Sequence, residues 1–113
     1  MSPTNAEVLQ HILDEMAFLK EHAEKVSREQ FLKDPVLKRA FVRCWEIIGE
    51  ATKNLDDSLR RDHPEVDWRG MAGMRDRLIH GYFSVDYELV WDAVQRKIPG
   101  TMETINRLRE SMK

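Results

Sequence analysis

The segment PVLKRAFVRCWEIIGEATKNLDDSLRRD, residues 35–62, decides the fold because it carries a long helical repeat. Its apolar residues recur every three or four positions, the spacing that places side chains on one face of an α-helix. The repeat comprises Leu37, Phe41, Cys44, Ile48, Ala51, Leu55 and Leu59, with Ala40 and Trp45 beside it. Asp34 and Pro35 suit the cap and the first position of such a helix. We therefore expect one continuous helix that ends near Asp62, ahead of His63-Pro64.

Two helix starts precede this segment. Thr4-x-x-Glu7 is a capping box, in which a hydroxyl and a carboxylate satisfy free backbone amides. The apolar stripe that follows consists of Leu9, Ile12, Leu13, Met16, Leu19 and Ala23. Ser27-x-x-Gln30 resembles a second capping box and predicts a short helix that stops before Asp34.

The C-terminal half predicts two more helices. After a short loop, one should run from Trp68 to Gly81, because glycine tolerates the left-handed conformation that often follows a helix. Asp86 can cap the last, whose apolar positions are Trp91, Val94, Ile98, Met102, Ile105, Leu108 and Met112. Proline removes a hydrogen bond inside a helix, so Pro99-Gly100 predicts a kink or a restart. The pattern as a whole predicts an all-α, up-and-down bundle of four to six helices.

Composition limits the kind of protein further. At 113 residues the chain suits one domain, residues 1–113, with 42% hydrophobic and 34% charged residues. The net charge of −2 argues against a general nucleic-acid coat but leaves room for a local basic site. Cys44 is the single cysteine, so no internal disulfide can form, and a cytoplasmic setting is expected. We see no signal peptide, no apolar run long enough for a membrane span, and no histidine spacing typical of zinc sites.

The segment RDRLIHGYF, residues 75–83, is harder to explain as ordinary core or surface. A charged triplet is usually a solvated helix face, and a histidine suits a helix C-terminus because of the helix dipole. Taken together, however, residues 68–81 carry three arginines against one aspartate. Guanidinium, imidazole and phenol groups could supply charge, proton transfer and positioning in phosphodiester chemistry. We therefore treat this segment as a candidate site.

Helix geometry raises a problem for this site. At about 100° per residue, Arg75 and His80 lie roughly 140° apart on an ideal helix and do not share a face. Either the helix unwinds at His80-Gly81, or two chains pair so that the two groups meet across a symmetry axis. Both solutions stay open at this point.

The spacing Arg75, four residues, His80, one residue, Tyr82 resembles the signature of the HEPN superfamily. More narrowly, it resembles the HepT-like toxins, the ribonuclease partners of minimal nucleotidyltransferase antitoxins. The stretch RAFVRCWEIIGEA (residues 39–51) is similar to the central helix of that family, and DWRGMAGMRDRLIHGYFSVDYELVW (residues 67–91) is similar to the segment with its active site. The resemblance covers roughly residues 5–110.

The resemblance implies a homodimeric, HEPN-like endoribonuclease that needs no cofactor and no metal and cleaves RNA by attack of the 2′-OH. His80 would act as general base or acid, Arg75 would stabilise charge on the phosphate, and Tyr82 would orient the site. Tyr82 also matches the tyrosine to which the antitoxin of this family attaches AMP, which adds negative charge and bulk where RNA must approach. The implied partners are a second copy of the chain, the nucleotidyltransferase antitoxin and the RNA substrate.

For the supporting residues, the sequence leaves two roles open. Asp76 could repel RNA, or it could pair with Arg75 or Arg77 and hold a guanidinium in place. A charged stripe, Arg39, Arg43, Glu46, Glu50, Lys53 and Asp57, follows residues 35–62. It is either an exposed face with ion pairs or partly the lining of a dimer cleft, with Glu46 or Glu50 holding Arg75. Trp45 and Trp68 are assigned to the core or an interface, and Trp91 to the core.

An alternative function is a non-catalytic helical interaction module whose motif serves only for binding or modification. RNA cleavage that depends on His80 and Arg75 would distinguish the enzyme from this module. A purely structural helical dimer is a third possibility.

Overall fold

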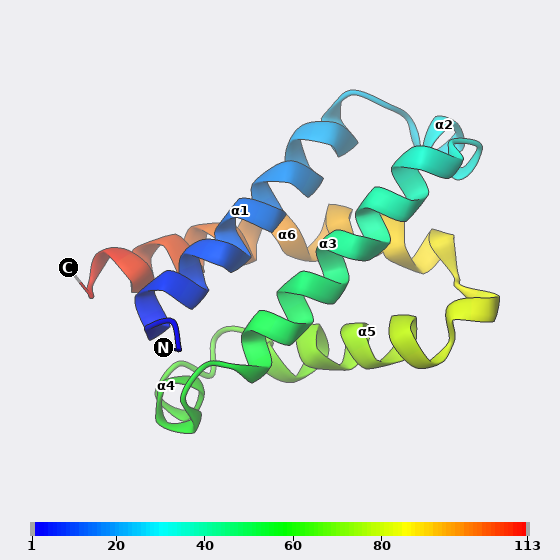
Figure 1. The fold of residues 1–113 in the computed structure, drawn as a ribbon. Coiled ribbons are helices and arrows are strands. Elements are labelled where there is room, and N and C mark those ends of the chain that lie inside the picture. The colour runs from blue at the N-terminus through cyan, green and yellow to red at the C-terminus, as the bar shows by residue number, and fades with distance from the viewer. Residues whose placement is uncertain (1, 113) are drawn as a thin grey trace.

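The structure is a computed structural model that describes residues 2–112. Six α-helices and one 3-10 turn follow one another without strands in this range: α1 Asn5–Glu24, α2 Arg28–Leu32, α3 Pro35–Lys53, α4 Asp57–Asp62, α5 Trp68–His80, η1 Tyr82–Ser84 and α6 Tyr87–Glu110. The prediction of an all-α bundle with four to six helices is confirmed. Figure 1 shows α1 and α3 side by side, α5 along one edge and α6 behind them.

The predicted caps form. The Thr4 hydroxyl accepts from the Glu7 amide at 3.2 Å, and the Glu7 carboxylate returns a bond to the Thr4 amide. Ser27 and Gln30 make the same reciprocal pair ahead of α2. Three aspartates cap the longer helices that follow: Asp34 before α3, Asp67 before α5 and Asp86 before α6. Helices α1, α2, α3, α5 and α6 therefore start where the sequence predicts.

The core lies where α3 is sandwiched between α1 and α5, with α6 against α1. Every apolar residue of the predicted stripe on α1 is buried, as are Trp45, Trp68 and Trp91. The Trp91 ring lies 5.1 Å from that of Phe31 and 6.3 Å from that of Phe41, centroid to centroid. The assignment of the three tryptophans to the core is confirmed.

The predicted continuous helix from Pro35 to Asp62 is wrong, because the chain turns between α3 and α4. Asn54 caps α3, and Leu55 enters the core at 3% exposure. The side chain of Asn5 donates to the Asp56 carboxylate at 3.0 Å and accepts from the Asp56 backbone amide at 3.2 Å. These two hydrogen bonds from the start of α1 stabilise the turn, and both Leu55 and Leu59 remain buried.

The last helix departs from the predictions at two places. Of the kink or restart predicted at Pro99-Gly100, the restart is absent, because helix α6 continues through Pro99. The carbonyl that loses its partner belongs to Gln95, and both residues lie on the exposed face, where water can hydrogen-bond to that carbonyl. Met112 is exposed rather than apolar core, because α6 ends at Glu110 and the residue lies beyond the helical repeat.

Within the described range, no helix is both long enough and apolar enough to cross a membrane.

Candidate active site

Helix α5 carries the candidate motif and is anchored by its apolar face. Trp68, Met71, Met74 and Leu78 are buried at a spacing of three or four residues. The Trp68 indole donates to the His63 carbonyl at 2.9 Å, which ties the start of α5 to the preceding loop. The charged residues of the motif therefore project from a helix whose orientation is fixed by its core face.

The crossing of α3 and α5 is set by Gly49, a residue that sequence reasoning missed. A Cβ on Gly49 would lie 2.2 Å from Cβ of Arg75 and 2.8 Å from the Met71 carbonyl oxygen. Only glycine allows this approach, and the base of the Arg75 side chain lies directly against α3. A glycine inside a strong helical repeat costs about 1 kcal/mol relative to alanine, which was the signal available in the sequence.

The guanidinium of Arg75 is held between two carboxylates. Its Nε lies 3.2 Å from Glu50 Oε2, close enough for an ion pair. The N–H bond of this buried nitrogen does not point at the carboxylate, so the two groups form no hydrogen bond. One terminal nitrogen donates to Asp76 Oδ1 at 3.1 Å. The same Asp76 oxygen accepts from Lys53 Nζ at 2.5 Å. The four side chains form a continuous charged network between α3 and α5.

Asp76 is held as a carboxylate ion in this network. The hydrogen bond from Lys53, followed by that from Arg75, lowers the pKa of its carboxyl group below the usual value. Asp76 therefore pairs with Arg75, one of the two partners considered from sequence, and within residues 2–112 its carboxylate makes no ion pair with Arg77. Its negative charge is matched by two cations.

Of the two glutamates predicted to hold Arg75, the structure places only Glu50 against it. Glu46 instead lies 3.5 Å from Arg43 on the same helix. Both glutamates nevertheless line a cleft of about 400 Å³ between α1, α3 and α5, together with His11, Glu15, Arg43 and Arg75. Part of the charged stripe on α3 therefore borders the cleft that contains Arg75.

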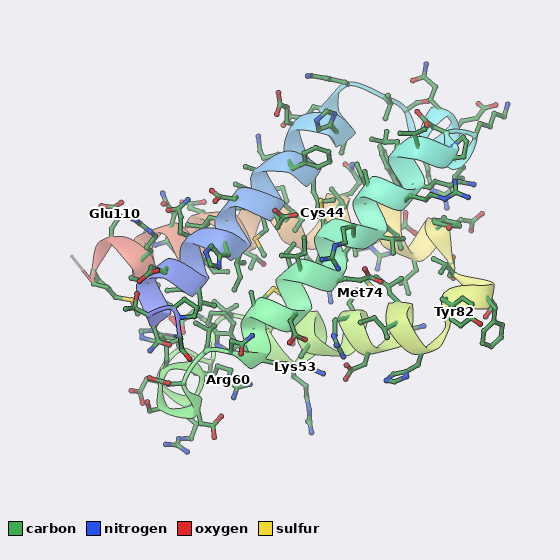
Figure 2. The ribbon with its side chains drawn as sticks, viewed as in Figure 1. Cys44, Lys53, Arg60, Met74, Tyr82 and Glu110 are labelled. Carbon is green, nitrogen blue, oxygen red and sulfur yellow. The ribbon has the colours of Figure 1, made fainter. Side chains whose placement is uncertain are left out.

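The other two motif residues lie where α5 ends. His80 is the last helical residue and is exposed, so the helix does not unwind before it. Tyr82 and Phe83 are 78% and 79% exposed, and their rings meet edge to face with centroids 5.7 Å apart. Figure 2 shows Tyr82 at the tip of the molecule, away from Lys53.

Gly81 ends α5 as predicted, but for a different reason. Its φ is −106°, which lies outside the left-handed region. A Cβ at this position would lie 2.9 Å from the Arg77 carbonyl oxygen, and the Gly81 amide donates to that same oxygen. Close approach, rather than a left-handed conformation, therefore favours glycine here.

Within one chain, Arg75 and His80 remain on different faces of α5. Arg75 is directed to α3 and half-buried, whereas His80 is exposed at the end of a continuous helix. Within residues 2–112, no three His, Cys, Asp or Glu side chains are grouped as a metal site would require. The arrangement offers a fixed cation and an accessible imidazole close together in sequence.

Comparison with known proteins assigns the family. The model of the family described as Ribonuclease HepT-like matches residues 12–108, which is most of the chain. The chain belongs to the HepT-like ribonuclease family. The resemblance read from Arg75, His80 and Tyr82 is thereby confirmed at the level of the family.

Relatives of this HepT-like chain span nearly its whole length. It is 48% identical over 105 residues to "Putative RNase TTE0752" of Caldanaerobacter subterraneus subsp. tengcongensis, covering 93% of this chain and 94% of that protein. It is 38% identical over 110 residues to "Probable ribonuclease HepT" of Thermococcus cleftensis, covering 97% and 100%. It is 39% identical over 100 residues to "Putative RNase MJ0127" of Methanocaldococcus jannaschii, covering 88% and 83%. No solved structure matches.

The family and these names identify the HepT-like chain as an endoribonuclease of the HEPN type. The enzyme hypothesis is confirmed in preference to the interaction module.

Proposed function

We propose that this HepT-like ribonuclease is the toxin of a toxin–antitoxin pair and cleaves RNA without a metal ion. The observation that carries the proposal is the geometry of the motif. Arg75 is fixed by Glu50 and Asp76, while His80 and Tyr82 are exposed at the end of the same helix. A fixed guanidinium can stabilise charge on a phosphate, and a solvent-accessible imidazole can transfer protons, which are two contributions that speed a transesterification at phosphorus.

In the proposed reaction, the 2′ oxygen of a ribose attacks the adjacent phosphorus and the bond to the 5′ oxygen breaks. His80 accepts the proton of the 2′-OH or donates one to the leaving 5′ oxygen. Arg75 stabilises the charge that builds on the phosphate oxygens. The products are a 2′,3′-cyclic phosphate and a 5′-OH, so no water is consumed in this step.

We further propose a homodimer, because one chain does not bring both groups to one face. Arg75 from one copy and His80 from another would meet in a shared cleft. The cleft beside Arg75 between α1, α3 and α5 is an opening that a second copy could complete. A twofold-symmetric dimer would contain two such shared sites, related by the symmetry axis.

Regulation is proposed to act on Tyr82. Tyr82 is 78% exposed, which favours access of a nucleotidyltransferase to its hydroxyl. The Tyr82 oxygen would attack the α-phosphate of ATP and release pyrophosphate, leaving AMP on the ring. The added phosphodiester is negative and would repel an RNA phosphate near His80. A cytoplasmic location fits both this partner and the RNA substrate.

The test is cleavage of RNA by purified protein in EDTA, with analysis of the ends. We expect 2′,3′-cyclic phosphate ends from the wild type and a loss of roughly 100-fold or more for His80→Ala and Arg75→Ala. His22→Ala and Arg107→Ala remove the same side-chain types from α1 and α6 and should cleave normally. Cleavage that survives in His80→Ala, or that needs a divalent cation, would overturn the mechanism. Co-expression with a nucleotidyltransferase should add multiples of AMP mass to the Tyr82 peptide, and relief of toxicity without that mass would refute the regulatory proposal.

A further inference from the structure

The outer face of α5 carries positive charge that no carboxylate balances. Most lysines and arginines within residues 2–112 lie beside a carboxylate, as Lys20 lies beside Glu24. Six do not: Lys38, Arg39, Arg61, Arg69, Arg77 and Arg96. The first two have other partners, since Lys38 lies over the Tyr87 ring and Arg39 donates to the Pro35 carbonyl. The remaining four arginines line two grooves that flank α5.

The first groove, of about 650 Å³, lies between α5, α4 and the end of α3. Four cations and two aspartates line it: Lys53, Arg60, Arg61, Arg69, Asp57 and Asp76. Both aspartates are already paired, one with Arg60 and the other with Lys53. Arg61 and Arg69 are exposed and supply the surplus positive charge of this groove.

The second groove, of about 400 Å³, lies between α5 and α6. Its charged lining consists of Arg77, Arg96, Lys97 and Asp92. Asp92 pairs with Arg28 on α2, and Lys97 pairs with Asp67. Arg77 and Arg96 are exposed and again leave a surplus positive charge.

Gly73 joins the two grooves, since it lines both of them. A Cβ at this position would meet nothing within 4 Å, so the space beside it is open. Arg69, Gly73 and Arg77 are spaced at four residues and lie on one face of α5, and His80 follows three residues later on the same face. The glycine therefore leaves a gap between two unpaired arginines on the helix face that ends at His80.

We propose that the sugar-phosphate backbone of the RNA substrate lies along this face of α5, crosses Gly73 and is delivered to His80. We call the face defined by Arg61, Arg69, Gly73, Arg77 and Arg96 the α5 track. The proposal rests on the proposed function, because it assumes that RNA is cleaved at His80. It adds a binding surface whose five defining residues lie outside the Arg75 network, although Lys53 and Asp76 of that network line the first groove.

The chemistry of the α5 track fits a phosphodiester strand better than a protein surface. Guanidinium groups bind phosphate with paired N–H donors, and those on the track have no competing carboxylate. Arg69 and Arg77 are eight residues apart, or about 12 Å along the helix axis, a length that several phosphates of an extended strand can follow. The one aromatic residue in the two linings, Trp68, is buried and offers no face for stacking.

The test is binding of a fluorescent 2′-O-methyl oligonucleotide, followed by anisotropy over a range of salt concentration. This probe cannot be cleaved through a 2′-OH, so binding is measured whether or not the chain is active. Each phosphate contact contributes a slope of about 0.7 in log K against log salt for single strands. Arg69→Gln with Arg77→Gln should therefore lower the slope by about 1.4 and weaken binding roughly 25-fold at 0.1 M salt.

The matched control is Lys20→Gln with Lys25→Gln, which removes the same charge from α1, on the side of the bundle away from α5 (Figure 1). It should bind the probe as the wild type does. Gly73→Leu should weaken binding without changing the salt slope, because it adds volume but no charge, and its thermal unfolding should show that it is folded.

The α5 track is overturned if the Arg69 and Arg77 double variant binds with the affinity and slope of the control, or if the wild type does not bind the probe. Binding along α5 without RNA cleavage in EDTA would refute the proposed function and leave the track standing. Cleavage together with unchanged binding in the α5 variants would refute the track alone.

Discussion

Replacing Gly49 with alanine should displace α5 from α3 and weaken both stability and activity. The added Cβ would lie 2.2 Å from Cβ of Arg75 and 2.8 Å from the Met71 carbonyl oxygen. Carbon atoms in contact prefer about 3.5–4.0 Å, so α5 must move by roughly 1 Å or more. The backbone carbonyl of Met71 cannot rotate away without breaking the hydrogen-bond pattern of α5.

The expected magnitude is a balance of two terms. Overpacking a well-packed contact costs about 1–3 kcal/mol, whereas alanine gains about 1 kcal/mol over glycine in a helix. We therefore expect Gly49→Ala to be destabilised by about 0–2 kcal/mol, which lowers Tm by up to about 10 °C in a domain of this size. A displacement near 1 Å at Arg75 should lower RNA cleavage by roughly 100-fold.

Gly73→Ala is the matched control, because its Cβ would meet nothing within 4 Å and it lies in the interior of α5. The free energy of unfolding of Gly73→Ala should rise by about 1 kcal/mol, and its Tm should rise by a few degrees. Thermal unfolding of both variants by circular dichroism measures the contrast. Equal stability of the two variants, or full RNA cleavage by Gly49→Ala, would refute the argument that Gly49 positions Arg75.

Three further predictions concern the charged network and the core. Glu50→Gln should lower RNA cleavage by roughly 10-fold. The free energy of unfolding should change by less than about 1 kcal/mol, because the ion pair of Glu50 with Arg75 is partly exposed. Glu46→Gln is the control and should change cleavage less. The pKa of Asp76 is lower in the folded chain than in the unfolded chain, so its contribution to stability is present above the unfolded pKa and is lost as pH falls through the folded pKa. In Asp76→Asn, the free energy of unfolding measured in urea should therefore change less with pH below about pH 4 than in the wild type. Burial, followed by the charge of Glu15, raises the pKa of Cys44 to about 12. Native protein at pH 8 should therefore react with a thiol reagent far more slowly than unfolded protein does. Equal reaction rates would contradict the buried placement of Cys44.

Local signals in the sequence were enough to locate every helix except α4. Thr4, Ser27, Asp34, Asp67 and Asp86 each cap the helix that follows them, because a cap depends on residues within one turn. The apolar stripes were equally reliable, since burial follows from the spacing within each helix. Only Met112, beyond the last helical turn, departs from its stripe.

The errors at the turn after α3, at Gly49 and at the partner of Arg75 arose where distant residues decide the structure. The turn after α3 depends on Asn5, which lies 51 positions before Asp56 in the chain. The role of Gly49 depends equally on the crossing with α5, which a pattern within α3 cannot reveal. Choosing between Glu46 and Glu50 as the partner of Arg75 required the rotation of α3 against α5, which only the packed structure fixes.

The most direct test of the composite site is to mix Arg75→Ala with His80→Ala and measure RNA cleavage in EDTA. If the two groups come from different copies, each mixed dimer contains one intact site and one site that lacks both groups. A freely exchanging equimolar mixture should then recover about one quarter of the wild-type rate, although each variant alone is inactive. A mixture no more active than the separate variants, under conditions where the subunits exchange, would contradict the account.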